Sequence, residues 1–150
     1  MTTSRDVLPR DLVHPGPVLP LGGQRRSLRL AGLPGPAARA RAFTGTALAE
    51  WSWPAPYLGQ DIVLLVTELV ANAARHAGGP LEIALEASET RLRIEVSDGS
   101  RALPALQYPH RPGLPGGHGL FIVQQTADRW GVERHGAGKT VWAEIASQTV

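Results

Sequence analysis

The sequence contains no cysteine, which excludes disulfide bonds and thiolate metal sites. Long apolar runs are also missing, because no window approaches the ~18 consecutive apolar residues of a membrane span. The first 24 residues mix prolines with charged residues and lack the apolar core of a signal peptide. We therefore expect a cytoplasmic protein with no membrane segment.

Lysine and aromatic residues are scarce as well. Lys139 is the only lysine among 15 Lys and Arg residues, the formal net charge is only +2, and aromatics make up 5% of the chain. Faces that bind nucleic acid usually combine clustered basic residues with aromatic side chains, and the arginines here are dispersed. We expect no direct nucleic-acid binding.

The length of 150 residues suits one domain with one hydrophobic core. Residues 1–24 are rich in Pro and Gly and show no periodicity, which predicts a disordered or loosely attached arm ahead of a domain over 25–150. Residues 25–31 alternate loosely and predict an edge strand. Residues 37–51 then predict a helix. We expect the inner side of that helix to carry Ala38, Ala42, Phe43, Ala47 and Leu48.

Residues 61–77 form the most strongly patterned stretch, with no Gly or Pro. The apolar residues follow the 3-and-4 spacing of a core-facing helix: Ile62, Leu65, Val66, Leu69, Val70 and Ala73. Glu68 and Asn72 are four residues apart and so share one helical face. Polar side chains are costly beside a buried stripe, although for this segment alone a solvated flank of the helix is the more ordinary explanation.

After this helix, apolar residues recur at every second position instead of every third or fourth. Residues 81–87 and 91–96 alternate apolar and polar side chains, which predicts two antiparallel strands joined by a turn at 88–90. Residues 101–118 hold several prolines and glycines, and a loop of this length in a compact domain is usually a lid or a binding loop.

A helix is expected from about 119–120 to 130, followed by a hairpin of strands at 132–135 and 140–145. The layout predicts a two-layer α/β sandwich, with a mixed, mostly antiparallel sheet and helices on one face.

Three polar features recur at the ends of these elements: Glu68 with Asn72, Asp98, and the glycine-rich stretch 116–119. An aspartate at a strand end can accept a hydrogen bond from the amino group of adenine, which guanine lacks at that position. Glycines at a helix start let backbone N–H groups approach phosphates. An asparagine oxygen can bind Mg²⁺, and a nearby glutamate can act as a general base.

Each feature alone has an ordinary explanation. Asp98-Gly99-Ser100 is a common turn sequence, and glycine-rich joints before helices are frequent. The stretch 136–140 superficially suggests a P-loop, but Glu133 stands where its first glycine should be and a strand is predicted to follow. The combination of all three features, in this order, favours a nucleotide site.

These residues resemble the nucleotide-binding boxes of the histidine-kinase/Hsp90-like ATPase superfamily. The resemblance is carried by Glu68-x-x-x-Asn72-Ala73-x-x-His76, Asp98-Gly99-Ser100, Gly117-x-Gly119-Leu120 and Gly138-Lys139-Thr140. The chain is most similar to the short, stand-alone branch, the bacterial anti-sigma-factor serine/threonine kinases, over roughly residues 25–146. The resemblance implies a Bergerat-type ATP-binding fold with a lid at about 101–118.

The resemblance also implies roles for particular residues. Glu68 would be the catalytic base and Asn72 the ligand of a Mg²⁺ bound with the ATP phosphates. Asp98 would bind adenine, with Thr140 supporting the adenine end. The phosphate side would be formed by Gly117, His118, Gly119 and Leu120. The partners implied are a sigma factor or an anti-sigma antagonist protein, and relatives often form homodimers.

Two departures from the superfamily pattern concern catalysis more than binding. The pattern Asp-x-Gly-x-Gly is not kept, since Gly99-Ser100-Arg101-Ala102 follows Asp98, and no arginine lies within the second glycine box. Charge stabilisation of a transferring phosphoryl group usually needs such a cation. The alternatives are a binding module in which ATP sets partner affinity without turnover, and an α/β domain that binds no nucleotide.

Overall fold

The computed structural model describes residues 23–54, 60–75, 78–101, 118–136 and 138–147, except for the side chains of residues 118–121. The elements are β1 (Gln24–Arg29), α1 (Pro36–Trp51), α2 (Gln60–Ala74), β2 (Pro80–Ala87), β3 (Arg91–Asp98), α3 (His118–Thr126), β4 (Arg129–His135) and β5 (Gly138–Ala146). The predicted arm at 1–24 lies almost wholly outside this range, although Gln24 already belongs to β1.

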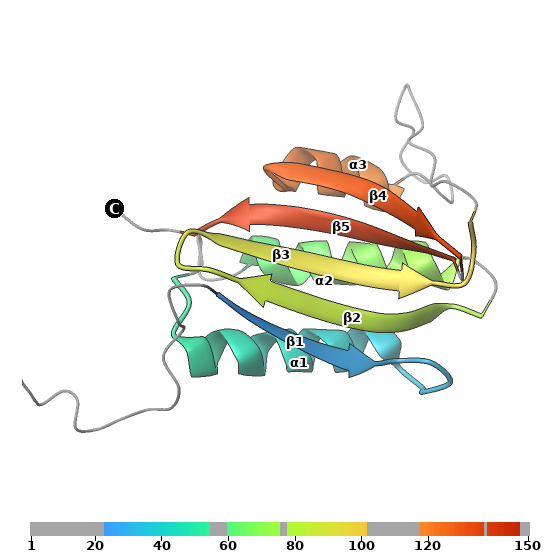
Figure 1. Ribbon diagram of the computed structural model, residues 1–150, viewed down its shortest axis with the longest axis horizontal. Coiled ribbons are helices and arrows are strands. Elements are labelled where there is room, and N and C mark those ends of the chain that lie inside the picture. Colours follow the sequence, from blue (N-terminus) through green and yellow to red (C-terminus); the bar gives the residue numbers. More distant parts are fainter. Residues whose placement is uncertain (1–22, 55–59, 76–77, 102–117, 137, 148–150) are drawn as a thin grey trace, which may run out of the picture.

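The five strands form one sheet in the order β1-β2-β3-β5-β4, and every described pairing is antiparallel. The three helices lie side by side behind this sheet in Figure 1, with α2 between α1 and α3. The predicted two-layer α/β sandwich is therefore confirmed, and β1 is the predicted edge strand.

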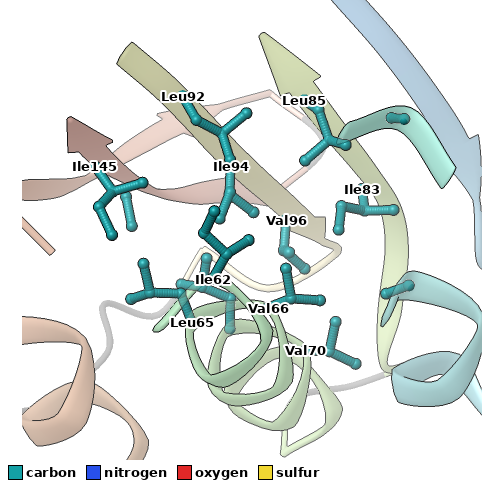
Figure 2. Packing of buried hydrophobic residues seen from close by; sticks show 14 of the residues in the cluster. Ile62, Leu65, Val66, Val70, Ile83, Leu85, Leu92, Ile94, Val96 and Ile145 are labelled. Carbon is teal, nitrogen blue, oxygen red and sulfur yellow. The ribbon is translucent and has the colours of Figure 1, made fainter. Parts of the chain in front are cut away.

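The core lies between α2 and the sheet. All six apolar residues of the predicted α2 stripe are buried, and Figure 2 shows Ile62, Leu65 and Val66 pointing toward Ile94 of β3. The facing strand positions alternate as expected for a sheet with one covered side, since Leu92, Ile94 and Val96 are all buried. Burial of this apolar surface is the main driving force for the fold.

The predicted inner face of α1 is wrong at two positions. Ala38 and Ala42 are exposed, whereas the buried residues are Ala40, Thr44, Ala47 and Trp51. Alanines occur all round this helix, so its apolar pattern defines a face only weakly. Its orientation instead follows Trp51, whose indole N–H donates to the Gln24 side chain of β1.

The predicted end of the helix after residue 118 is also wrong. α3 ends at Thr126 rather than near Trp130, which lies in β4 opposite Ala143. The Ala127 N–H still donates to the Val123 carbonyl, but the Asp128 N–H already donates to the Glu144 carbonyl of β5. Pairing with the sheet therefore ends the helical pattern earlier than the sequence suggests.

Candidate functional site

One end of the molecule collects most of the predicted site. Figure 1 shows the C-terminal ends of α2 and β3 at the same end as the start of α3 and the start of β5. Antiparallel pairing places the end of β3 beside the start of β5, with Asp98 directly opposite Lys139. The fold thus brings Asn72, Asp98 and the start of α3 to one end, although they are far apart in the chain.

Asp98 is fully buried and its carboxylate is already bonded. Its Oδ1 accepts hydrogen bonds from the Ser100 N–H at 2.8 Å and from Lys139 Nζ at 3.0 Å, and its Oδ2 accepts from Lys139 Nζ at 2.9 Å. The Ser100 contact is an Asx-turn, which fixes the carboxylate at the strand end. Both charged side chains have 0% exposure, so they form a fully enclosed ion pair.

The backbone explains why Lys139 reaches this position. Strand alternation places Lys139 on the same side of β5 as Val141 and Ala143, which face the helices. Gly138 brings β5 unusually close to β3, because a Cβ there would lie 2.0 Å from the Asp98 carbonyl oxygen. Only glycine fits this approach.

Lys139 is a bonded neighbour of Asp98 that the sequence pattern did not indicate. Its box was recognised, but the role was given to Thr140. Two signals could have found it: Lys139 is the only lysine in the chain, and it lies two residues before an apolar inward-facing position in a predicted strand.

Thr140 faces the other side of the sheet. Its hydroxyl lies 2.9 Å from the Ser97 hydroxyl and 3.2 Å from His135 Nε2. Ser97 and Thr140 are direct neighbours in the register, one residue out of phase with the Asp98–Lys139 pair. The structure does not bring the Thr140 hydroxyl to the Asp98 carboxylate, and its role at the adenine end stays a prediction.

Asn72 presents an unpaired oxygen. The residue is only 6% exposed, and Oδ1 has no hydrogen-bond partner among the residues that the structure describes. A buried carbonyl oxygen without a hydrogen-bond donor destabilises the fold. Such an unpaired atom is expected at a binding site, because the ligand supplies the missing partner. Glu68 lies one turn earlier on α2 and is half-buried.

A neutral carboxamide oxygen is a suitable ligand for Mg²⁺, which prefers oxygen donors and shares its coordination with substrate phosphates and water. Within the described ranges, no group of three His, Cys, Asp or Glu residues could hold a metal ion. If a nucleotide carries Mg²⁺ to this end of the sheet, the Asn72 oxygen would be a protein ligand of the cation. The donor set fits Mg²⁺ carried by a nucleotide.

The predicted phosphate side falls partly outside the described residues. Gly117, His76 and nearly all of the expected lid at 101–118 lie outside the described residues. His118, Gly119 and Leu120 open α3, so their backbone N–H groups belong to the first turn of a nine-residue helix. Such N–H groups have no partner within the helix and favour an anion.

The face of the sheet away from the helices carries a network of charges. Glu95 accepts hydrogen bonds from Arg25 at 2.9 Å and from Arg93 at 2.7 Å, and Arg93 also lies 4.2 Å from the ring centre of Trp142. Burial acts to raise the pKa of Glu95, but the hydrogen bonds from Arg25 and Arg93 outweigh it, so the pKa is lowered. The network links β1 to β3 across the outer face, because Arg25 lies on β1 and Arg93 and Glu95 lie on β3.

A hollow of about 270 Å³ on the outer face does not belong to the candidate site. It is lined by Gly23, Glu86, Ala87, Ser88, Arg91, Arg93 and Glu144. Arg91 begins β3, whereas Asp98 ends it, so the hollow lies at the opposite end of the strands.

Among the described helices, none has both the length and the apolar character that crossing a membrane requires.

A family model described as the histidine kinase-like ATPase domain matches residues 30–145. A search of curated proteins found no match. The matched range contains every site residue considered above.

Proposed function

This chain belongs to the histidine kinase-like ATPase domain family, and from that premise we propose that it is a regulatory protein that binds ATP with Mg²⁺ at the end of the sheet that carries Asp98. Family membership supports ATP as the ligand. The observation that carries the proposal is the buried oxygen of Asn72, which has no partner in the described part of the chain and lies at the same end as the buried carboxylate of Asp98. The two groups suit the opposite ends of one Mg-nucleotide.

Each residue has one task in this proposal. Asn72 holds the Mg²⁺, which supplies positive charge to the phosphates when it is bound. The first backbone N–H groups of α3, at His118, Gly119 and Leu120, bind phosphate oxygens. Asp98 accepts a hydrogen bond from the adenine amino group. Glu68 stands one helical turn from Asn72, where it can accept a proton from an attacking hydroxyl.

The proposed reaction is that of an anti-sigma-factor-type serine/threonine kinase in bacterial signalling. A serine hydroxyl of an antagonist protein attacks the γ-phosphorus of ATP, and its proton passes to Glu68. The new oxygen–phosphorus bond forms as the bond between the γ-phosphorus and the bridging oxygen breaks, and ADP leaves. The partners would be that antagonist and a sigma factor.

The alternative is a binding module without turnover, and the enclosed ion pair favours it. Asp98 and Lys139 are both fully buried, so a base can reach them only after a local rearrangement. Binding energy spent on that rearrangement couples nucleotide binding to conformation, and therefore to partner affinity. In this reading ATP acts as a switch and Glu68 has no catalytic task.

Calorimetry with Mg-ATP tests the shared part of both readings. We expect binding to the wild-type protein, and no heat at millimolar ATP with folded protein would refute the proposal. Asn72→Ala should weaken Mg-ATP and leave Mg-free ATP almost unchanged, since only the metal ligand is removed. Asp98→Asn should weaken binding strongly, and it is preferable to Asp98→Ala because it leaves Lys139 a partner oxygen.

Incubation with labelled ATP and candidate antagonist proteins separates the kinase from the module. Glu68→Ala should bind ATP nearly as tightly as wild type and transfer no phosphate to the antagonist. Equal transfer by this variant and wild type would reject Glu68 as the base. Absence of transfer by the wild-type protein to any antagonist that binds it would favour the module.

A further inference from the structure

The Asp98–Lys139 pair has bonding capacity that its own contacts do not use. An ammonium group has three donors, and Lys139 Nζ gives two of them to the oxygens of Asp98. Each carboxylate oxygen can accept about two hydrogen bonds. Oδ1 receives two, from Ser100 and Lys139, while Oδ2 receives one among the described residues. Among the described residues, one donor of Lys139 and one acceptor of Asp98 therefore remain unused.

An adjacent donor and acceptor match the edge of a purine base in a way that a lone carboxylate does not. The adenine edge offers an amino donor at position 6 and an acceptor at N1. A 6-oxopurine offers an acceptor at position 6 and a donor at N1. Asp98 alone would favour adenine, because a carboxylate repels a 6-oxo group and leaves it without a donor.

We infer that Lys139 is a second base-contacting residue, which donates to N1 of adenine or to the oxygen of a 6-oxopurine and so lets the site accept both purine classes. The inference rests on the proposed nucleotide binding at this end of the sheet. With ATP, Asp98 Oδ2 accepts from the amino group and Lys139 donates to N1. With a 6-oxopurine the two contacts exchange places along the base edge. Oδ2 then accepts from the N1 proton and Lys139 donates to O6, which requires the flexible Lys139 side chain to swing to the other side of the carboxylate.

The close approach of β5 to β3 indicates that the Asp98–Lys139 pair is a defined feature of the fold. Gly138 allows the approach that places Lys139 directly opposite Asp98, and a side chain at residue 138 would meet the Asp98 backbone. Both charged groups are completely enclosed, which is costly unless they are paired. The local rearrangement that admits a base would then expose the unused donor and acceptor together.

Two ATP analogues test the inference on the unmodified protein. In 1-deaza-ATP, a C–H group replaces N1 and removes only the acceptor for Lys139. We expect 1-deaza-ATP to bind about tenfold more weakly than ATP, since a buried charged donor loses its partner. Inosine triphosphate carries the 6-oxo edge, and we expect it to bind within about tenfold of ATP. The inference requires both results, so equal binding of ATP and 1-deaza-ATP, or a much weaker inosine triphosphate, overturns it.

The variant Lys139→Met removes the donor and keeps a side chain of similar length. In this variant ATP and 1-deaza-ATP should bind equally, and inosine triphosphate should lose at least about tenfold relative to ATP. Arg25→Met, which removes a cation from the outer face of the sheet, should leave all three ratios unchanged. Unchanged ratios in Lys139→Met would also overturn the inference, and if this variant does not fold the wild-type comparison decides.

The same titrations separate this inference from the proposed function. If folded wild-type protein binds neither ATP nor inosine triphosphate, nucleotide binding itself is refuted. If ATP binds and the analogue pattern fails, only the role of Lys139 is refuted.

Discussion

Lys139 and Asp98 are both fully buried, and each is the charged partner of the other. Lys139→Met leaves an enclosed carboxylate without its cation, and breaking a buried pair in this way typically costs about 3–5 kcal/mol. For a domain of this size each kcal/mol lowers the melting temperature by about 2–4 °C. We therefore expect the melting temperature to fall by roughly 6–20 °C. The lost free energy is a large part of the typical unfolding free energy of a domain.

A double-variant cycle shows whether the cost comes from the stranded charge. Asp98→Asn/Lys139→Met removes both charges and keeps an acceptor for the Ser100 N–H. It should recover most of the lost stability, because replacing a whole buried pair is often neutral.

The measurement is urea denaturation followed by circular dichroism. Arg25→Met is the matched control, since it breaks an ion pair whose arginine side chain is 50% exposed and should cost less than about 1 kcal/mol. If Lys139→Met cost no more than Arg25→Met, the view that the buried pair controls stability would be refuted.

Three further predictions concern stability. Gly138→Ala should cost about 2 kcal/mol or more in denaturant titrations, because its Cβ would lie 2.0 Å from the Asp98 carbonyl oxygen. Gly45→Ala, where no atom lies within 4 Å, should instead stabilise α1 by about 0.5–1 kcal/mol, and equal effects of the two would contradict the close approach. The pKa of Glu95 is lowered in the folded state, so its contribution is present above the ordinary glutamate pKa and is lost as the pH falls through the folded-state pKa. Glu95→Gln should therefore flatten the loss of stability between neutral pH and about pH 3, and unchanged melting curves for this variant would count against the assignment. Leu69→Ala, at a fully buried position of α2, should cost about 2–5 kcal/mol by urea denaturation, and a cost below about 0.5 kcal/mol would show that the site is not packed as described.

Local patterns in the sequence were sufficient for most of the fold. The apolar stripe of α2 and the alternation in β2 and β3 predicted which residues face the core, because burial of one face produces those periods directly. The inner face of α1 could not be predicted in this way, since alanine packs acceptably on any side of a helix. Contact of Trp51 with β1 decided that face.

The candidate site, like the fold, could be predicted only in part from the sequence. Residue types and spacing identified Glu68 and Asn72 as polar groups in costly positions and Asp98 as a carboxylate at a strand end, and the resemblance of their motifs supplied the expected ligand. The sequence alone could not show that the charge beside Asp98 is Lys139, 41 residues away. That neighbour depends on strand order and register.

The amino-acid sequence by itself determined the type and order of the elements and the chemical groups available, because these follow from interactions between residues close in the chain. Only the tertiary structure decided which of those groups meet. The antiparallel register of β3 with β5 enclosed a carboxylate with an ammonium and turned Thr140 to the opposite side of the sheet. In a strand, a shift of one residue exchanges the two faces, and only contacts between distant segments select the register.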